Sequence, residues 1–160
     1  MESCKKKEGE SKMTRVVTML LFGLLFWMAF DFIFYAGLMV NYIKAYNIPI
    51  FFNEFFVDNQ FWLLWIPGVL LYGAVFMLKN IKSKKAAFYL LSIAIAALPW
   101  IPGFGEQIGK ALFSKNGVNY SFDHTKVENV TLLYSGRGYD YVLLNKRRGA
   151  VKYPTSYRTN

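Results

Sequence analysis

The sequence is poor in the residues that bind metals and cofactors. Its 160 residues include one cysteine, Cys4, and one histidine, His124. A single cysteine excludes an internal disulfide, a Cys-x-x-Cys zinc or redox pair and a cysteine-ligated iron–sulfur cluster. A single histidine excludes a metal site built on paired histidines. We therefore expect no metal site, no cofactor and no catalytic residue in this chain, and we expect that it is not an enzyme.

Acidic residues are also scarce. Asp and Glu number 10 against 19 Lys and Arg, which gives a net charge of +9. Apolar residues make up 54% of the chain and aromatic residues 19%, and this composition excludes a disordered polar chain. The length suits one domain, or a few membrane spans with a small appendage.

Charge is nearly absent from three long segments. Residues 16–40 contain one charged side chain, Asp31, while residues 61–78 and 86–101 contain none. Roughly 20 apolar residues are needed to span the hydrocarbon core of a bilayer, and interfacial Trp and Lys residues anchor the two shorter segments. A soluble helix keeps one polar face, whereas residues 16–40 carry aromatic side chains around the whole helix. The sequence therefore predicts a mainly α membrane protein with three transmembrane helices.

Basic residues near the ends of the spans indicate the orientation. One side of the membrane would carry nine of them and the other side three (Lys5, Lys6, Lys7, Lys12, Arg15, Lys79, Lys82, Lys84 and Lys85 against Lys44, Lys110 and Lys115). Because basic residues concentrate on the cytoplasmic side, residues 1–15 and the link 79–85 are expected in the cytoplasm. The membrane domain then covers residues 16–102, and residues 103–160 lie outside the cytoplasm. We favour a bacterial inner membrane, with the tail in the periplasm.

The link between the first two spans is rich in phenylalanine. Residues 48–60 are predicted to form a short helix in the outer interface, with Pro49 in its first turn. Four side chains on one stripe would contact lipid or a partner (Phe51, Phe52, Phe55 and Phe56). The alternative is an aromatic loop packed on the spans.

The tail is predicted to contain a short helix and a small β-hairpin or meander. Apolar alternation over residues 129–134 and 139–144 flanks a Ser-Gly-Arg-Gly turn, and a third strand covers residues 150–153. A β region of about 40 residues is too small to be stable alone, so it rests on the membrane part or adds its edge to another chain's sheet. A basic cluster in this tail is either a solvated turn or a contact for lipid phosphates or an acidic partner (Lys146, Arg147 and Arg148).

Asp31 is the one ionisable residue inside a predicted span. Its position, about 4–5 Å from the middle of residues 16–40 at 1.5 Å per residue, makes an unpaired carboxylate costly. Trp27 and Tyr35, one turn away on either side, share its helix face. Three interpretations stay open. Asp31 meets a basic or polar group of another subunit, it is a neutral acid packed against Tyr35 or Tyr72, or it carries protons or ions.

These features predict a non-catalytic accessory or structural subunit that assembles with, or stabilises, a larger membrane protein complex. The expected partners are membrane lipids and other membrane subunits, in a hetero-complex rather than a homo-oligomer. Nucleic acid is disfavoured because the basic tail is expected outside the cytoplasm. Two alternatives remain: an immunity or inhibitor protein that binds a membrane-active toxin, and a small oligomeric transporter or channel that uses Asp31.

Overall fold

The chain forms two compact units, each assembled from separate stretches of sequence. The computed structural model describes residues 2–78, 82–122, 125–144 and 149–159, with side chains from residue 12 onward. Unit 1 comprises Met1–Ile33 and Gln60–Ala96, and unit 2 comprises Phe34–Asn59 and Ala97–Asn160. The chain therefore crosses between the units three times. The domains predicted from hydropathy, residues 1–15, 16–102 and 103–160, have other boundaries than these two units.

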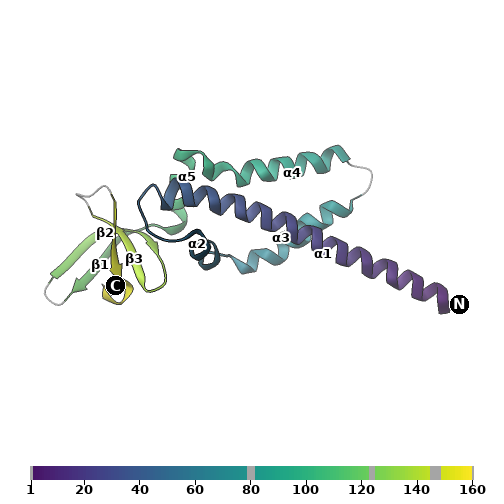
Figure 1. Ribbon diagram of the computed structural model, residues 1–160, viewed down its shortest axis with the longest axis horizontal. Coiled ribbons are helices and arrows are strands. Elements are labelled where there is room, and N and C mark those ends of the chain that lie inside the picture. Colours follow the sequence, from purple (N-terminus) through teal and green to yellow (C-terminus); the bar gives the residue numbers. More distant parts are fainter. Residues whose placement is uncertain (1, 79–81, 123–124, 145–148, 160) are drawn as a thin grey trace. The chain divides into compact units, whose positions relative to one another are not determined.

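Unit 1 consists of three helices (Figure 1). They are the first part of α1 (Glu2–Leu38), together with α3 (Trp62–Met77) and α4 (Lys82–Ala96). In the described part of the chain, one helix is long and apolar enough to cross a membrane, over Lys12–Ile43. The number rises to three only if each of two interrupted helix pairs counts as one span. One predicted span therefore has a clear counterpart in the structure, and the other two stay predictions.

Glycines bring α3 into direct backbone contact with α1. A Cβ atom on Gly23 would stand 2.1 Å from the carbonyl oxygen of Val69, and one on Gly73 would stand 2.3 Å from that of Met19. Distances this short leave no room for any side chain. The pairing of low-numbered residues on α1 with high-numbered residues on α3 makes the two helices antiparallel.

Aromatic rings complete the packing of unit 1. Phe22 stacks on Phe76 with ring centroids 4.0 Å apart, and Phe26 stacks on Tyr89 at 4.3 Å. Helix α3 continues through Pro67. A Cβ atom on the following residue, Gly68, would lie 2.4 Å from the Trp27 ring, so this glycine serves close packing.

Unit 2 contains a five-stranded antiparallel sheet in the order β4-β3-β2-β1-β5. The strands are β1 (Lys115–Phe122), β2 (Thr125–Ser135), β3 (Tyr139–Leu143), β4 (Ala150–Pro154) and β5 (Arg158–Thr159), with a 3-10 turn, η3 (Thr155–Tyr157), before β5. The predicted hairpin is confirmed as β2 and β3. Its turn contains Gly138 at φ +80°, a conformation that glycine adopts without strain. The predicted third strand is confirmed as β4, whereas β1 and β5 were not predicted.

The core of unit 2 joins the sheet to residues 34–59. Leu38 at the end of α1 and Tyr42 in the π-helical turn η1 (Met39–Ile43) are fully buried with Leu133 and Tyr134 of β2. The Tyr42 hydroxyl donates a hydrogen bond to the carbonyl oxygen of Leu133 at 2.7 Å. The sheet therefore has a larger core than its own residues provide. Leu38 and its neighbours pack inside unit 2, whereas the helix that is long and apolar enough to cross a membrane continues to Ile43. The end of the first span at residue 40 therefore stays a prediction.

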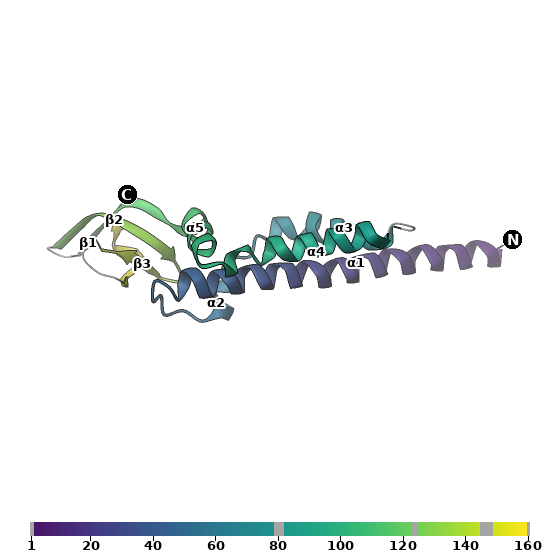
Figure 2. The ribbon, with the colours of Figure 1, turned by 90° about the horizontal axis from the view of Figure 1, so that it is seen from above.

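Helix α5 (Pro102–Phe113) packs beside the sheet (Figure 2). It follows the 3-10 turn η2 (Leu98–Trp100) and begins with proline, which suits the first position of a helix. Cβ atoms on Gly105 and Gly109 would lie 2.2 Å from the carbonyl oxygen of Pro99 and from Tyr42 Cγ. Glycine is required at both positions for this helix to reach the core.

Candidate functional site

Asp31 lies in a buried polar cluster of unit 1. Asp31 is 9% exposed. The side chain of Gln60, which immediately precedes residue 61 of the second predicted span, interacts with the Asp31 carboxyl group. The indole Nε1 of Trp65 donates a hydrogen bond to Gln60 Oε1 at 2.9 Å, so the amide oxygen is occupied. Asp31 therefore has a polar neighbour in its own chain, an amide that the sequence interpretation did not consider.

The cluster is not saturated with hydrogen bonds. In the described part of the chain, three buried side-chain atoms lack a hydrogen-bond partner: Trp27 Nε1, Asp31 Oδ2 and Gln60 Nε2. Trp27 and Asp31 are one turn apart on the same face of α1. Each buried polar group without a partner costs about 1–3 kcal/mol. Two donors and one acceptor in an apolar surrounding can take up a small polar group such as water, or retain a proton on the carboxyl group.

The residues near Asp31 also show where it lies along the antiparallel helices α1 and α3. Gln60 precedes α3, whereas Gly23 lies against Val69 in the middle of α3. Eight residues of helix separate Gly23 from Asp31, or about 12 Å. Asp31 therefore lies at the level of the first residues of α3. Its position within residues 16–40 had instead predicted a level near the middle of the first span.

The other two residues predicted with Asp31 are divided between the units. Trp27 is in unit 1, where its ring contacts the edge of Tyr72 at a centroid distance of 6.0 Å. Tyr35 is in unit 2, where its hydroxyl donates a hydrogen bond to the backbone carbonyl of Asn59. All three residues nevertheless lie one turn apart on the continuous helix α1, and their common role stays a prediction.

The four phenylalanines of the first link do not share one surface. Phe51 is 83% exposed, but Phe55 is fully buried and packs against Tyr35 and Tyr134. The predicted short helix is confirmed as α2 (Phe52–Asp58), which begins three residues after Pro49 and leaves Phe51 outside it. The prediction that Phe55 contacts lipid or a partner is therefore wrong. Phe52 and Phe56 stack on each other and are half-buried.

A second buried aspartate, which sequence reasoning missed, lies in the sheet. Asp140 is fully buried and accepts hydrogen bonds from the Tyr120 hydroxyl at 2.8 Å and the Ser135 hydroxyl at 2.7 Å. Arg158 Nε lies 3.5 Å from the same carboxylate. Burial, followed by the hydrogen bond to Asp140, raises the pKa of Tyr120. Asp140 is a single polar residue among the apolar residues of β3, and this local pattern gives no signal for the network.

An ion pair joins the hairpin to α2. Arg137, in the turn between β2 and β3, donates from Nε to both carboxylate oxygens of Asp58 at 2.9 Å. Hydrogen bonding to Asp58 raises the pKa of Arg137. Asn59 Nδ2 donates to the Tyr134 hydroxyl at 3.0 Å. The predicted basic cluster (Lys146, Arg147 and Arg148) and His124 lie outside the residues that the structure describes.

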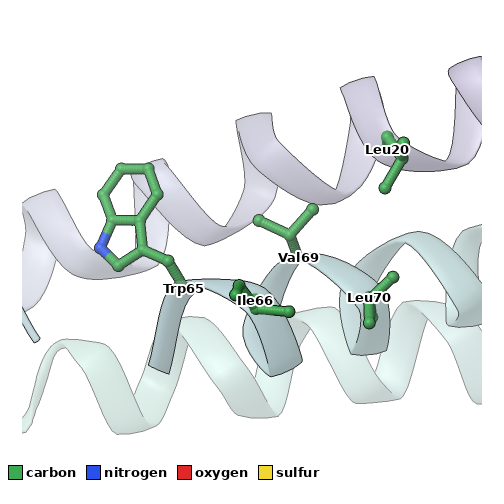
Figure 3. Close-up of a pocket in the computed structure, with 5 residues that line it drawn as sticks. All are labelled: Leu20, Trp65, Ile66, Val69 and Leu70. Carbon is green, nitrogen blue, oxygen red and sulfur yellow. The ribbon is translucent and has the colours of Figure 1, made fainter. Parts of the chain in front are cut away.

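A shallow apolar groove runs along unit 1. It has a volume of about 230 Å³ and is lined by Leu20 of α1 and four residues of α3 (Trp65, Ile66, Val69 and Leu70). Figure 3 shows Val69 pointing from α3 towards α1 and Leu20 pointing from α1 towards α3. Among the described residues, no group of three or more His, Cys, Asp or Glu side chains is arranged to hold a metal ion.

Comparisons of this chain with protein-family models, curated proteins and solved structures gave no match.

Proposed function

We propose that this chain is a multi-pass integral membrane protein that acts as a non-catalytic accessory subunit of a larger membrane complex. Its N-terminus would lie in the cytoplasm and unit 2 outside, in the arrangement of a bacterial inner membrane protein. The basic residues at the cytoplasmic ends of the predicted spans support this orientation.

The apolar exterior of unit 1 is the observation that carries the proposal. All three helices expose large aliphatic side chains, including Leu25 of α1 at 61%, Leu63 of α3 at 79% and Leu90 of α4 at 68%. The same unit buries the Asp31 side chain and the Nε2 atom of Gln60. An aqueous environment favours the reverse distribution, whereas lipid or a neighbouring membrane helix favours this one.

The groove between α1 and α3 offers a place for a partner helix. Its volume of about 230 Å³ exceeds that of cavities of about 150 Å³ that hold benzene, so an apolar side chain fits inside it. The close approach at Gly23 and Gly73 keeps the two walls of the groove at a fixed spacing. Trp65, which lines the groove, also donates a hydrogen bond to Gln60, so a partner in the groove would contact the polar cluster of Asp31 through this indole.

Photo-crosslinking in native membranes tests this function. A photoreactive amino acid at Leu70, in the groove, is expected to form an adduct with one distinct membrane protein. The same amino acid at Leu91, an exposed leucine of α4 outside the groove lining, is the matched control and should give no protein adduct. The proposal fails if Leu70 reacts only with lipid, or if it forms only dimers of this chain.

The unpaired atoms around Asp31 favour a second candidate, a small transporter or channel. A buried carboxyl oxygen beside two unpaired donors is a suitable stopping point for a proton. Purified protein in vesicles that enclose a pH-sensitive dye would then conduct protons, and Asp31→Asn would abolish the flux. Glu128→Gln, at an exposed residue of β2, is the control and should leave the flux unchanged. Vesicles that stay impermeable with the wild-type chain exclude this candidate.

A further inference from the structure

Helix α5 carries an apolar flank on the outside of unit 2. Ile101 directly before the helix is 49% exposed, and within the helix Phe104 is 52% and Leu112 56% exposed. On the 3.6-residue period of a helix, Phe104, Ala111 and Leu112 fall on one side of α5, around the half-buried Ile108. Single exposed apolar residues are ordinary, but here large ones share one side at the beginning and near the end of the helix.

The opposite side of α5 is polar and ordered. Lys110 Nζ donates to Glu106 Oε1 at 2.6 Å, and the Tyr46 hydroxyl donates to the same oxygen at 2.7 Å. These hydrogen bonds, first from Lys110 and then from Tyr46, lower the pKa of Glu106, so its carboxylate is charged at neutral pH. Gln107 is exposed at the boundary between this side and the apolar flank. Helix α5 therefore has three sides, which face the unit 2 core, an apolar exterior and water.

Unit 2 holds α5 in a fixed orientation. Gly105 and Gly109 fit against Pro99 and Tyr42 with no space for a side chain. Asn41 Nδ2 donates to the carbonyl oxygens of Pro99 and Trp100 at 2.9 and 2.8 Å, which fixes the turn that enters the helix. The apolar flank thus cannot rotate towards the core to escape water.

Chain connectivity keeps this flank near the end of α4. Phe104 follows Ala96, the last residue of α4, by eight residues, and a fully extended chain of that length reaches about 28 Å. The turn η2 and the start of α5 shorten this distance further. Trp100, a residue type that concentrates at membrane interfaces, lies between the two helices. If α4 spans the membrane, the apolar flank stays close to the bilayer surface.

We infer that α5 is an interfacial helix whose apolar flank binds the lipids of the outer leaflet. Ile101, Phe104 and Leu112 insert at the boundary between headgroups and acyl chains, while Lys110 and Glu106 stay on the side that faces water. This inference rests on the proposed function, because it requires α4 to span the bilayer. The lipid contact would hold unit 2 at the membrane surface, in addition to the three chain crossings.

Fluorescence quenching of the full chain tests the inference. In a Cys4→Ser background, single cysteines replace Phe104, Leu112 or Gln107 and are labelled with an environment-sensitive dye. A label at Leu90, on the exposed side of α4, reports on the span. Each protein is reconstituted in vesicles of phosphatidylcholine and phosphatidylglycerol that contain a nitroxide either near the headgroups or near the chain ends. Iodide serves as the quencher in water.

The expected result is severalfold stronger quenching by the headgroup nitroxide at Phe104 and Leu112 than at Gln107. Iodide should quench Gln107 most strongly.

Stronger quenching of Phe104 and Leu112 by the chain-end nitroxide would overturn the inference, because α5 would then enter the bilayer core. Equal access of iodide to all three α5 positions, with Leu90 still quenched by lipid, would also overturn it but leave the membrane proposal standing. Loss of lipid quenching at Leu90 would contradict the proposed function itself. Ala111→Cys, which removes no large apolar side chain, repeats the test if Phe104→Cys disturbs the fold.

Discussion

Among the described residues, each unit buries one aspartate, and the two carboxyl groups have opposite surroundings. In unit 2, Asp140 receives hydrogen bonds from three hydroxyl groups, those of Tyr120, Ser135 and Thr155, and lies 3.5 Å from the Arg158 guanidinium. In unit 1, Asp31 has one interacting amide, from Gln60, and its Oδ2 has no hydrogen-bond partner. Asp140 is fully buried and Asp31 nearly so, so burial alone does not distinguish them.

The difference lies in what each carboxyl group does for the fold. A buried carboxylate with several donors holds together the strands that provide them. A buried carboxyl with an unsatisfied oxygen carries a cost that packing elsewhere must offset. We therefore interpret Asp140 as a residue that stabilises the fold. Asp31, in contrast, is the residue for which we propose an interaction with a partner. Four predictions test this comparison and the packing on which it depends.

Replacement of Asp140 should have the largest effect. Asp140→Ala leaves the hydroxyls of Tyr120 and Ser135 and the guanidinium of Arg158 without their acceptor. Breaking a buried charge network in this way costs about 3–5 kcal/mol of unfolding free energy. Thermal unfolding of the full chain, followed by the near-ultraviolet circular dichroism of its tyrosines, measures this loss. Ser135→Ala removes one donor and should cost only about 1 kcal/mol. Equal melting temperatures for Asp140→Ala and the wild type would contradict the structural role.

The glycine contact of unit 1 should come next. Gly23→Ala gains about 1 kcal/mol in helix propensity but places a methyl group against the Val69 carbonyl. Because the methyl group would meet backbone atoms, which cannot move aside like a flexible side chain, the cost of overpacking should outweigh the gain in helix propensity. We expect the unfolding free energy to fall by about 1–3 kcal/mol. Gly103→Ala is the matched control, since no atom lies within 4 Å of its Cβ position. A lower melting temperature for both variants would show that Gly23 has no special packing role.

Removal of the Asp31 carboxyl should have a small effect on stability. Asp31→Leu replaces an unsatisfied polar group by an apolar one in apolar surroundings, so the unfolding free energy should change by less than about 1 kcal/mol in either direction. The partner adduct at Leu70 should weaken at the same time. Thermal unfolding in mild detergent and the crosslinking yield measure the two effects. A loss as large as that of Asp140→Ala would abolish the distinction between the two aspartates.

The pH dependence of α5 should give the smallest effect. The pKa of Glu106 is lowered by its hydrogen bonds to Lys110 and Tyr46, so the folded state favours the charged form. Its contribution to stability is present above the ordinary pKa of glutamate and disappears as the pH falls through the lower folded value. Because the pair is exposed, the contribution is a few tenths of a kcal/mol. The melting temperatures of the wild type and Glu106→Gln should therefore differ slightly at neutral pH and converge in acid.

Local patterns in the sequence predicted the local structure of the hairpin. The turn before Tyr139 contains glycines where a tight turn requires them, and the flanking strands alternate in hydropathy. Strand β1 escaped prediction because Asn116 and Asn119 interrupt its alternation and because its register against β2 shifts twice. Asn119 accepts a hydrogen bond from the backbone of Asn129, a contact that no local pattern reveals.

The division into units was beyond local reasoning. A run of apolar residues looks the same whether it will face lipid or a protein core, so Leu38 was predicted to be part of a span. Helix periodicity relates Asp31 to residues three or four positions away. Gln60 lies 29 positions further along and meets Asp31 only because α3 runs antiparallel to α1. The apolar spans could thus be predicted from sequence, but the polar cluster inside them depends on tertiary pairing.

The discontinuity of unit 2 determines when it can fold during synthesis. Tyr42 leaves the ribosome about 90 residues before its hydrogen-bond acceptor, the carbonyl of Leu133, because 91 positions separate them. Until β2 and β3 are made, Leu38, Tyr42 and Phe55 have no sheet to cover them, while α3 and α4 are already complete. Helices of unit 1 can therefore associate first, and unit 2 closes late around a segment that was made early. A chaperone that shields this segment would act between the synthesis of α2 and that of β3.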